Sequence, residues 1–123
     1  MAKTIELHVE ERKRGTRCCE SLLKLQFDVE EARQLSTDLQ ALAHPVRLRI
    51  LDILASNEGV VCVCDLQETL PVKQPTISHH LKLLRDAGLI DCERQGLWAY
   101  YFIRRDVLRE LGTRVTQGLK ALM

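Results

Sequence analysis

The stretch of residues 62–88, CVCDLQETLPVKQPTISHHLKLLRDAG, constrains the fold of this chain more than any other. Its apolar spacing predicts two helices, one over residues 62–70 and one over residues 75–87. Pro71 breaks the helical pattern and Gly88 suits the C-terminal cap of the second helix, so the connection between the helices is short. Two helices joined by a tight turn are typical of a helix-turn-helix.

The second of these helices has an apolar face and a polar face. Ile77, Leu81 and Leu84 recur at helical spacing and are expected to face the core. Polar side chains project opposite to them or from the flanks, with Gln74 at the head of the helix: Thr76, Ser78, His79, Lys82 and Arg85. Such side chains hydrogen-bond to base edges and phosphates, so they favour operator double-stranded DNA over another protein as the partner.

Two short segments rich in β-forming residues follow, at residues 89–94 and 97–103, with Gln95-Gly96 as the turn between them. A hairpin directly after the second helix is typical of the wing of a winged helix-turn-helix. Arg94 and Gln95 near its tip suit contact with the DNA backbone or the minor groove. The predicted fold class is therefore mainly α with a β-hairpin wing, a winged helix-turn-helix.

Helical spacing also predicts scaffold helices at residues 29–43 and from Pro45 onward, and a terminal helix from Asp106. The terminal helix carries a stripe of apolar residues: Leu108, Leu111, Val115, Leu119 and Leu122. On so small a body this stripe has little to pack against in its own chain, so we expect a dimeric protein, a homodimer paired through it. The predicted organisation is an N-terminal arm at residues 1–28 and a DNA-binding and dimerisation domain at residues 29–123.

Composition limits the class of protein. Of 123 residues, 46% are hydrophobic and 28% are charged, which is ordinary for a globular chain. No apolar run approaches the ~20 residues that a membrane span needs, and the N-terminus has no apolar signal segment, so a cytoplasmic location is expected. The net charge of +1 does not itself indicate a nucleic-acid binder, but residues 71–105 are net positive.

The chain has five cysteines, at Cys18, Cys19, Cys62, Cys64 and Cys92. An odd number in a reducing compartment makes structural disulfides unexpected and leaves free thiols or metal ligands. Residues two apart in a regular helix point about 200° apart, so the sulfurs of Cys62 and Cys64 converge only if Cys62 lies at or before the helix start. The alternative is that both pack as small apolar residues. Cys92 alternates with Ile90 and is expected to face the core.

The strings ALAHPVRLRIL, CVCDL, QPTISHHLKLLRDAGLI and GLWAYY, in this order, resemble the ArsR/SmtB family of metal- and metalloid-sensing repressors. The resemblance covers residues 39–103 and implies a homodimeric repressor that leaves its operator when an inducer binds. The family's arsenical pattern is Cys-x-Cys-x-x-Cys, and its third position here is Gln67. Other members complete the site with N-terminal cysteines, a role for which Cys18 and Cys19 are the candidates. The zinc site on the terminal helix of some members is not expected, since this helix has no histidine.

The resemblance and the number of thiols together predict the inducer. Three thiolates suit As(III) or Sb(III), and an adjacent cysteine pair with CVCDL is similar to arsenic-operon members, so arsenite or antimonite is the leading expectation. The alternative is Cd(II), Pb(II) or Zn(II) bound by all four of Cys18, Cys19, Cys62 and Cys64. A second alternative is a redox sensor in which these thiols oxidise.

An enzyme is not expected, because the chain has no C-x-x-C motif and no evident nucleophile-base pair. The histidines have other expected roles. His79 points outward toward DNA, and His80 is a structural partner beside the apolar face of its helix. His44 is unassigned, with capping of the second scaffold helix as one option.

Overall fold

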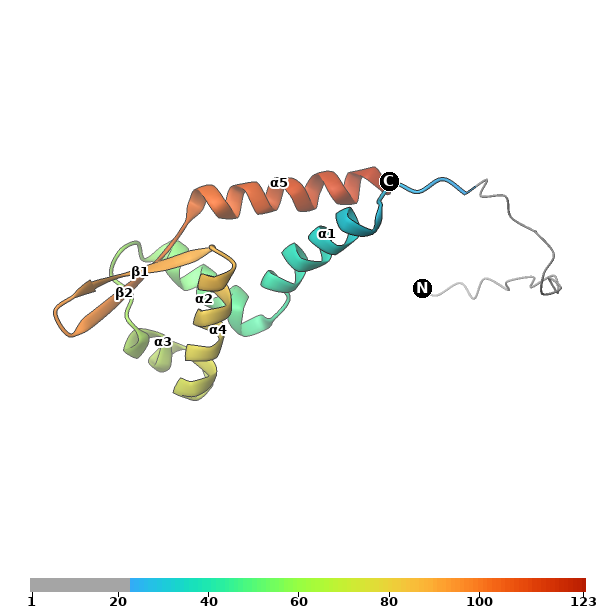
Figure 1. Cartoon of the computed structure of the whole chain (residues 1–123). Coiled ribbons are helices and arrows are strands. Elements are labelled where there is room, and N and C mark those ends of the chain that lie inside the picture. The colour runs from blue at the N-terminus through green and yellow to red at the C-terminus, as the bar shows by residue number, and fades with distance from the viewer. Residues whose placement is uncertain (1–22) are drawn as a thin grey trace.

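The computed structural model describes residues 23–123. The elements in order are α1 (Val29–Leu42), α2 (Pro45–Ser56), α3 (Val63–Thr69), α4 (Gln74–Asp86), β1 (Ile90–Gln95), β2 (Trp98–Ile103) and α5 (Arg105–Ala121). Figure 1 shows α2, α3, α4 and the hairpin gathered in one body, while α1 and α5 run side by side away from it. The predicted winged helix-turn-helix, mainly α with a β-hairpin wing, is confirmed, and the predicted ends of its elements differ by one residue or a few.

Two helix starts follow directly from local side-chain chemistry. Asp28 caps α1, since its carboxylate accepts from the backbone N–H of Glu31 at 2.7 Å. His44 caps α2, since its Nδ1 accepts from the backbone N–H of Val46 at 3.1 Å, and Pro45 occupies the first helical position. Capping was the option that the sequence left open for His44.

The core lies where α2, α3, α4, the hairpin and the first half of α5 meet. Its largest fully buried side chains are Ile50, Leu54, Leu66, Ile77, Leu84, Leu89 and Ile90. Ile77, Leu81 and Leu84 are all buried, so the predicted inward face of α4 is confirmed. The polar face of the same helix is thereby fixed toward solvent, because a helix repeats every 3.6 residues.

The hairpin is a two-stranded antiparallel sheet in which Ile90 pairs with Ile103 and Gln95 with Trp98. Gly96 takes φ +64° in the turn, a left-handed conformation that glycine adopts without strain. The hairpin also holds the segment before α3, because the carbonyl of Val61 accepts from the N–H of Tyr101 at 2.7 Å. The backbone next to Cys62 is therefore tied to the wing.

The pairing of α1 with α5 depends on a buried acid. Asp38 is 5% exposed and receives two hydrogen bonds from Arg114, from Nε at 2.9 Å and from the terminal nitrogen at 3.0 Å. The hydrogen bond from Arg114 is the main reason that the pKa of Asp38 lies below its ordinary value of 3.8. Gly118 lets the helices approach closely, since a Cβ there would lie 2.9 Å from Leu35.

The expectation that the terminal helix has little to pack against in its own chain is wrong. Leu111 is 3% exposed in the core, and Leu108 and Val115 pack against that core. The far half of α5 is different, because Leu119 is 46% exposed and Leu122 is 61% exposed. These two residues are the members of the predicted dimerisation stripe that remain accessible.

Asp38→Asn is expected to lower the free energy of unfolding by about 1–2 kcal/mol at neutral pH, since the buried carboxylate loses its charged hydrogen bonds to Arg114, whose side chain is 45% exposed. A carboxylate with a lowered pKa stabilises the fold above its unfolded-state pKa and loses this effect as pH falls through the folded-state value. The difference between wild type and variant, measured by urea unfolding, should therefore shrink below about pH 4. Asp86→Asn, which removes an exposed ion pair, is the control. Equal loss in both variants would contradict this.

Candidate thiol centre and nucleic-acid interface

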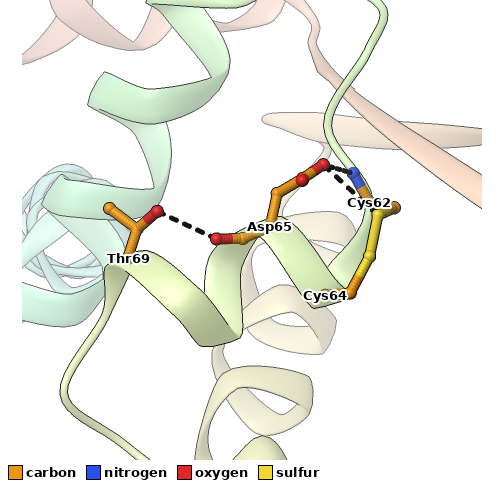
Figure 2. Close-up of a disulfide and its surroundings, with 4 residues drawn as sticks. All are labelled: Cys62, Cys64, Asp65 and Thr69. Carbon is orange, nitrogen blue, oxygen red and sulfur yellow. Dashed lines mark hydrogen bonds between the residues drawn. A yellow bond between two sulfur atoms is a disulfide. The ribbon is translucent and has the colours of Figure 1, made fainter.

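The head of α3 brings two sulfurs together. Cys62 is the N-cap residue with φ −104° and ψ 172°, an extended conformation, and the helix begins at Val63. Cys62 therefore lies before the helix start, which is the condition under which its sulfur and that of Cys64 converge. The two Cα atoms are 5.4 Å apart, and the sulfurs are joined in a disulfide (Figure 2).

This disulfide corrects the expectation of free thiols at these two positions. The separation of the Cα atoms lies within the range that a disulfide requires. A spacing of two residues is unsuitable only inside a regular helix, and the extended backbone of Cys62 removes that restriction. The same convergence serves a reduced site, because two thiols that can form a disulfide are also close enough to bind one soft ion.

Asp65 is the residue of this centre that sequence reasoning missed. Its Oδ2 accepts from the backbone N–H of Cys62 at 2.9 Å and lies 3.2 Å from the sulfur of Cys62. Because a disulfide sulfur has no hydrogen, the contact with sulfur is a hydrogen bond only when Cys62 is a thiol. Figure 2 shows the carboxylate turned toward Cys62, while the hydroxyl of Thr69 donates to the Asp65 carbonyl at 2.9 Å. An acid three residues after a helix cap is the signal that points to it.

Cys62, Cys64 and Asp65 form a set of possible metal ligands, with one ligand atom from each within 4.8 Å of the others. Cys62 is buried, whereas Cys64 and Asp65 are exposed, so the site opens to solvent on one side. Two sulfurs and a carboxylate oxygen suit a thiophilic ion that accepts a mixed donor set. The residues present therefore fit an ion, with room for further ligands from the open side.

The remaining cysteines stand apart from this set. Cys18 and Cys19 lie outside the residues that the structure describes. Cys92 is a free, half-buried thiol on β1, opposite Tyr101, and is not a member of the ligand set found in residues 23–123. Gln67 replaces the third cysteine of the arsenical pattern, and its amide lies 3.5 Å from that of Gln74 at the start of α4.

The structure places all eight predicted DNA-contacting residues on exposed surface. Six lie on α4: Gln74, Thr76, Ser78, His79, Lys82 and Arg85. The other two, Arg94 and Gln95, lie at the tip of the hairpin. His80, in contrast, is 5% exposed on the inward face, which confirms its predicted structural position.

Two of the predicted DNA-binding cations have acidic neighbours. Lys82 pairs with Asp86 at 2.9 Å, and Arg85 pairs with Asp91 at 3.3 Å. Both pairs are exposed, where such a contact is worth about 0–1 kcal/mol, so phosphate groups can replace the carboxylates. These side chains line a hollow of about 540 Å³ between α4 and the hairpin.

Comparison with known proteins decides the family. Residues 44–91, which span the helix-turn-helix, match the family described as bacterial regulatory protein, arsR family. An HTH-type transcriptional regulator of Methanocaldococcus jannaschii is 39% identical over 83 residues, 68% of this chain and 92% of that protein. The chain belongs to the ArsR family.

Other ArsR-family relatives carry names that refer to arsenic. The arsenical resistance operon repressor of Staphylococcus xylosus is 41% identical over 76 residues, 62% of this chain and 71% of that protein. The crystal structure of a possible transcriptional regulator for arsenical resistance superposes with a TM-score of 0.57 at 31% identity, over 63% of this chain and 78% of that one. The protein is thus an ArsR-family transcriptional repressor that acts on operator DNA, and not an enzyme.

None of the helices in residues 23–123 has both the length and the apolar character needed to cross a bilayer.

Asp65→Ala is expected to weaken binding of Cd(II) to the reduced protein by about 10-fold or more, because the extended backbone of Cys62 loses its acceptor and the site loses an oxygen ligand. Competition with a chromophoric chelator measures the affinity. Glu68→Ala removes an exposed acid from the same helix and serves as the control. An unchanged affinity in Asp65→Ala would exclude the carboxylate from the centre.

Proposed function

We propose that this repressor releases its operator when Cys62 and Cys64 bind a thiophilic metalloid, arsenite or antimonite. The observation that carries the proposal is the convergence of the two sulfurs at the head of α3, the first helix of the helix-turn-helix. Relatives named arsenical resistance operon repressors support the choice of ion. A soft trivalent centre favours thiolate ligands over the oxygen ligands that dominate a protein surface.

The chemistry needs reduced thiols and a third donor. Arsenous acid carries three hydroxyl groups, and each thiol that enters displaces one of them as water, with the thiol proton taken up by the departing hydroxide. Cys62 and Cys64 together displace two. We propose that Cys18 or Cys19 displaces the third, so that the arm at residues 1–28 becomes attached to the domain at residues 29–123.

The alternative inducer is Cd(II), Pb(II) or Zn(II). A divalent ion of this kind takes about four ligands, which Cys18, Cys19, Cys62 and Cys64 would supply together. Asp65 favours this alternative to some extent, because its carboxylate adds an oxygen donor that a trigonal three-sulfur arsenic site does not use.

Attachment at Cys62 acts on both parts of the DNA-reading surface. Only residues 70–73 separate α3 from α4, and the neighbouring Val61 is hydrogen-bonded to Tyr101 of the wing. A shift of the Cys62 backbone would therefore displace both α4 and the hairpin. An allosteric coupling of about 1–3 kcal/mol would weaken operator binding about 5–150-fold.

We propose that the exposed polar side chains of α4 read base edges in the major groove, while Arg94 and Gln95 contact the backbone or minor groove. A homodimer places two such surfaces about one helical turn of DNA apart. The exposed apolar side chains of Leu119 on α5 and of Leu122, its C-cap residue, support pairing at the C-terminal end of α5. Of the predicted stripe, Leu108, Leu111 and Val115 serve mainly the core of their own chain.

The disulfide between Cys62 and Cys64 supports a second candidate function, a thiol-based redox sensor. The two candidates differ in their chemistry, because oxidation removes two protons and two electrons from the thiols, whereas ion binding leaves sulfur at the same oxidation level. Peroxide in metal-free buffer is therefore the discriminating reagent.

The test uses reduced protein and an operator duplex selected by the wild type from a random-sequence library. Titration with arsenite and, separately, with Cd(II) should produce sulfur-to-ion ultraviolet absorption and at least about a 5-fold loss of DNA affinity in fluorescence anisotropy. The double variant Cys62→Ser/Cys64→Ser should lose both signals. Cys92→Ser should retain them, because Cys92 lies outside the ligand set of residues 23–123.

Three results would change this account. A full response in the double variant would exclude Cys62 and Cys64 as the sensor. Normal responses in Cys18→Ser, in Cys19→Ser and in the variant with both changes would exclude the arm. Release by peroxide but by neither ion, with recovery on adding reductant, would make the protein a redox sensor.

A further inference from the structure

Arg47, near the start of α2, connects two helices that are not adjacent in the chain. Its Nε donates to the carbonyl of Ala41 at 3.0 Å, and one terminal nitrogen donates to the carbonyl of Gln40 at 2.8 Å. These carbonyls belong to the last turn of α1, and that of Gln40 also accepts from the backbone N–H of Ala43 at 3.3 Å. The other terminal nitrogen lies 3.0 Å from Nδ1 of His80 on α4. One guanidinium therefore joins the end of α1 to α4, the second helix of the helix-turn-helix.

The contact with His80 requires a neutral imidazole. A guanidinium has donors and no acceptor, so Nδ1 of His80 must accept, and the ring proton must lie on Nε2. An imidazolium would instead turn an N–H toward Arg47. In residues 23–123, neither Arg47 nor His80 has a carboxylate as a hydrogen-bond or ion-pair partner that would stabilise a second positive charge.

The surroundings of His80 also oppose a positive charge. Its side chain is buried, the ring of His44 at the start of α2 lies 4.2 Å away between centroids, and that of His79 lies 5.3 Å away. Burial is the main cause that lowers the pKa of His80 below its ordinary value of 6.5, and His44, Arg47 and His79 lower it further. A histidine with a lowered pKa stabilises its folded arrangement fully above about pH 6.5 and progressively less as pH falls through the folded-state value.

We propose that Arg47 and His80 are positioning residues for DNA reading, which hold α4 against the end of α1 only while His80 is neutral. The outward face of α4 carries His79, which adjoins His80 in the chain, and Lys82, which lies two residues after it. A change in the orientation of the inward face therefore displaces the side chains that read DNA. Operator affinity consequently falls when His80 is protonated, whether or not an ion is bound to the thiols.

The proposal goes beyond ion sensing and does not depend on it. It depends only on α4 acting as the DNA-reading helix of an ArsR-family protein. If arsenite and Cd(II) leave operator binding unchanged, the sensor proposal fails while the proton dependence can still be measured in ion-free buffer.

The experiment measures operator affinity by fluorescence anisotropy between about pH 8 and about pH 5.5, across the range in which histidine titrates. All proteins carry His79→Gln, because an exposed His79 beside phosphates would gain charge at low pH and strengthen binding. In this background, affinity should fall about 5-fold or more toward low pH. Adding His80→Gln, whose amide stays uncharged, should reduce the change to less than about 2-fold. The operator duplex is the one selected by the wild type.

His44→Asn in the same background is the matched control, since asparagine is a good N-cap residue and does not titrate. Its affinity should still fall about 5-fold or more toward low pH, and the fall should begin at a higher pH, because His44 no longer lowers the pKa of His80. Circular dichroism at each pH verifies that the variants remain folded. The proposal would be overturned if operator affinity showed the same pH dependence with and without His80→Gln. It would also be overturned if His44→Asn abolished the pH dependence and His80→Gln did not.

Nitrogen NMR of the histidine rings gives a second measurement. It reports the tautomer of His80, which a role in packing alone would not determine. At pH 7.5, His80 should be the neutral Nε2–H tautomer, with Nδ1 shifted by the hydrogen bond from Arg47. Arg47→Lys should weaken operator binding and move the Nδ1 signal, because one ammonium cannot reach both carbonyls of α1 and the imidazole. A proton on Nδ1 in the wild type, or an Arg47→Lys protein with unchanged DNA affinity and pH profile, would contradict the proposal. If Arg47→Lys does not fold, the His80→Gln profile decides.

Discussion

The backbone at Cys62 is the constraint on which the proposed sensor depends. An extended N-cap residue, held by the carboxylate of Asp65 at 2.9 Å, places one sulfur ahead of α3 and lets the sulfur of Cys64 approach it. A helix that began one turn earlier would turn these side chains to opposite sides. The sulfur pair is thus a property of the helix start, and Asp65 stabilises both the helix and the centre.

This constraint is connected to the DNA-reading surface at short range. The segment containing Val61 is hydrogen-bonded to the wing, and α3 leads into α4 through a turn of four residues. On its other side, α4 is fixed through His80 and Arg47 to the C-terminal end of α1, the helix that follows the N-terminal arm in the chain. An ion bound by both the arm and Cys62 would therefore act on α4 by two routes, through α3 and through α1.

The sequence predicted the parts of this structure that follow from periodicity. The inward face of α4 at Ile77, Leu81 and Leu84, the turn at Gly96 and the cap at His44 each depend on a few neighbouring residues. The disulfide was not predicted because an odd number of cysteines in a reducing compartment favours free thiols. Whether the two sulfurs converge depends on where α3 begins to within one residue, which apolar spacing does not specify.

Contacts between distant residues were missed for a different reason. Asp38 and Arg114 are separated by 76 positions, and Arg47 and His80 by 33. One sequence carries no signal that pairs them. The predicted dimerisation stripe included too many residues. The sequence of an amphipathic helix does not distinguish packing against another chain from packing against its own core, as Leu111 does. The contribution of Cys18 and Cys19 stays a prediction.

The most direct test of the account is the number of sulfur atoms bound to arsenic in the reduced protein with one equivalent of arsenite. X-ray absorption at the arsenic edge reports this number. The account predicts three sulfur ligands and no oxygen ligand, with one sulfur replaced by oxygen in the Cys18→Ser/Cys19→Ser variant. An arsenic atom with three sulfur ligands in that variant, or one bound only to oxygen in the wild type, would contradict it.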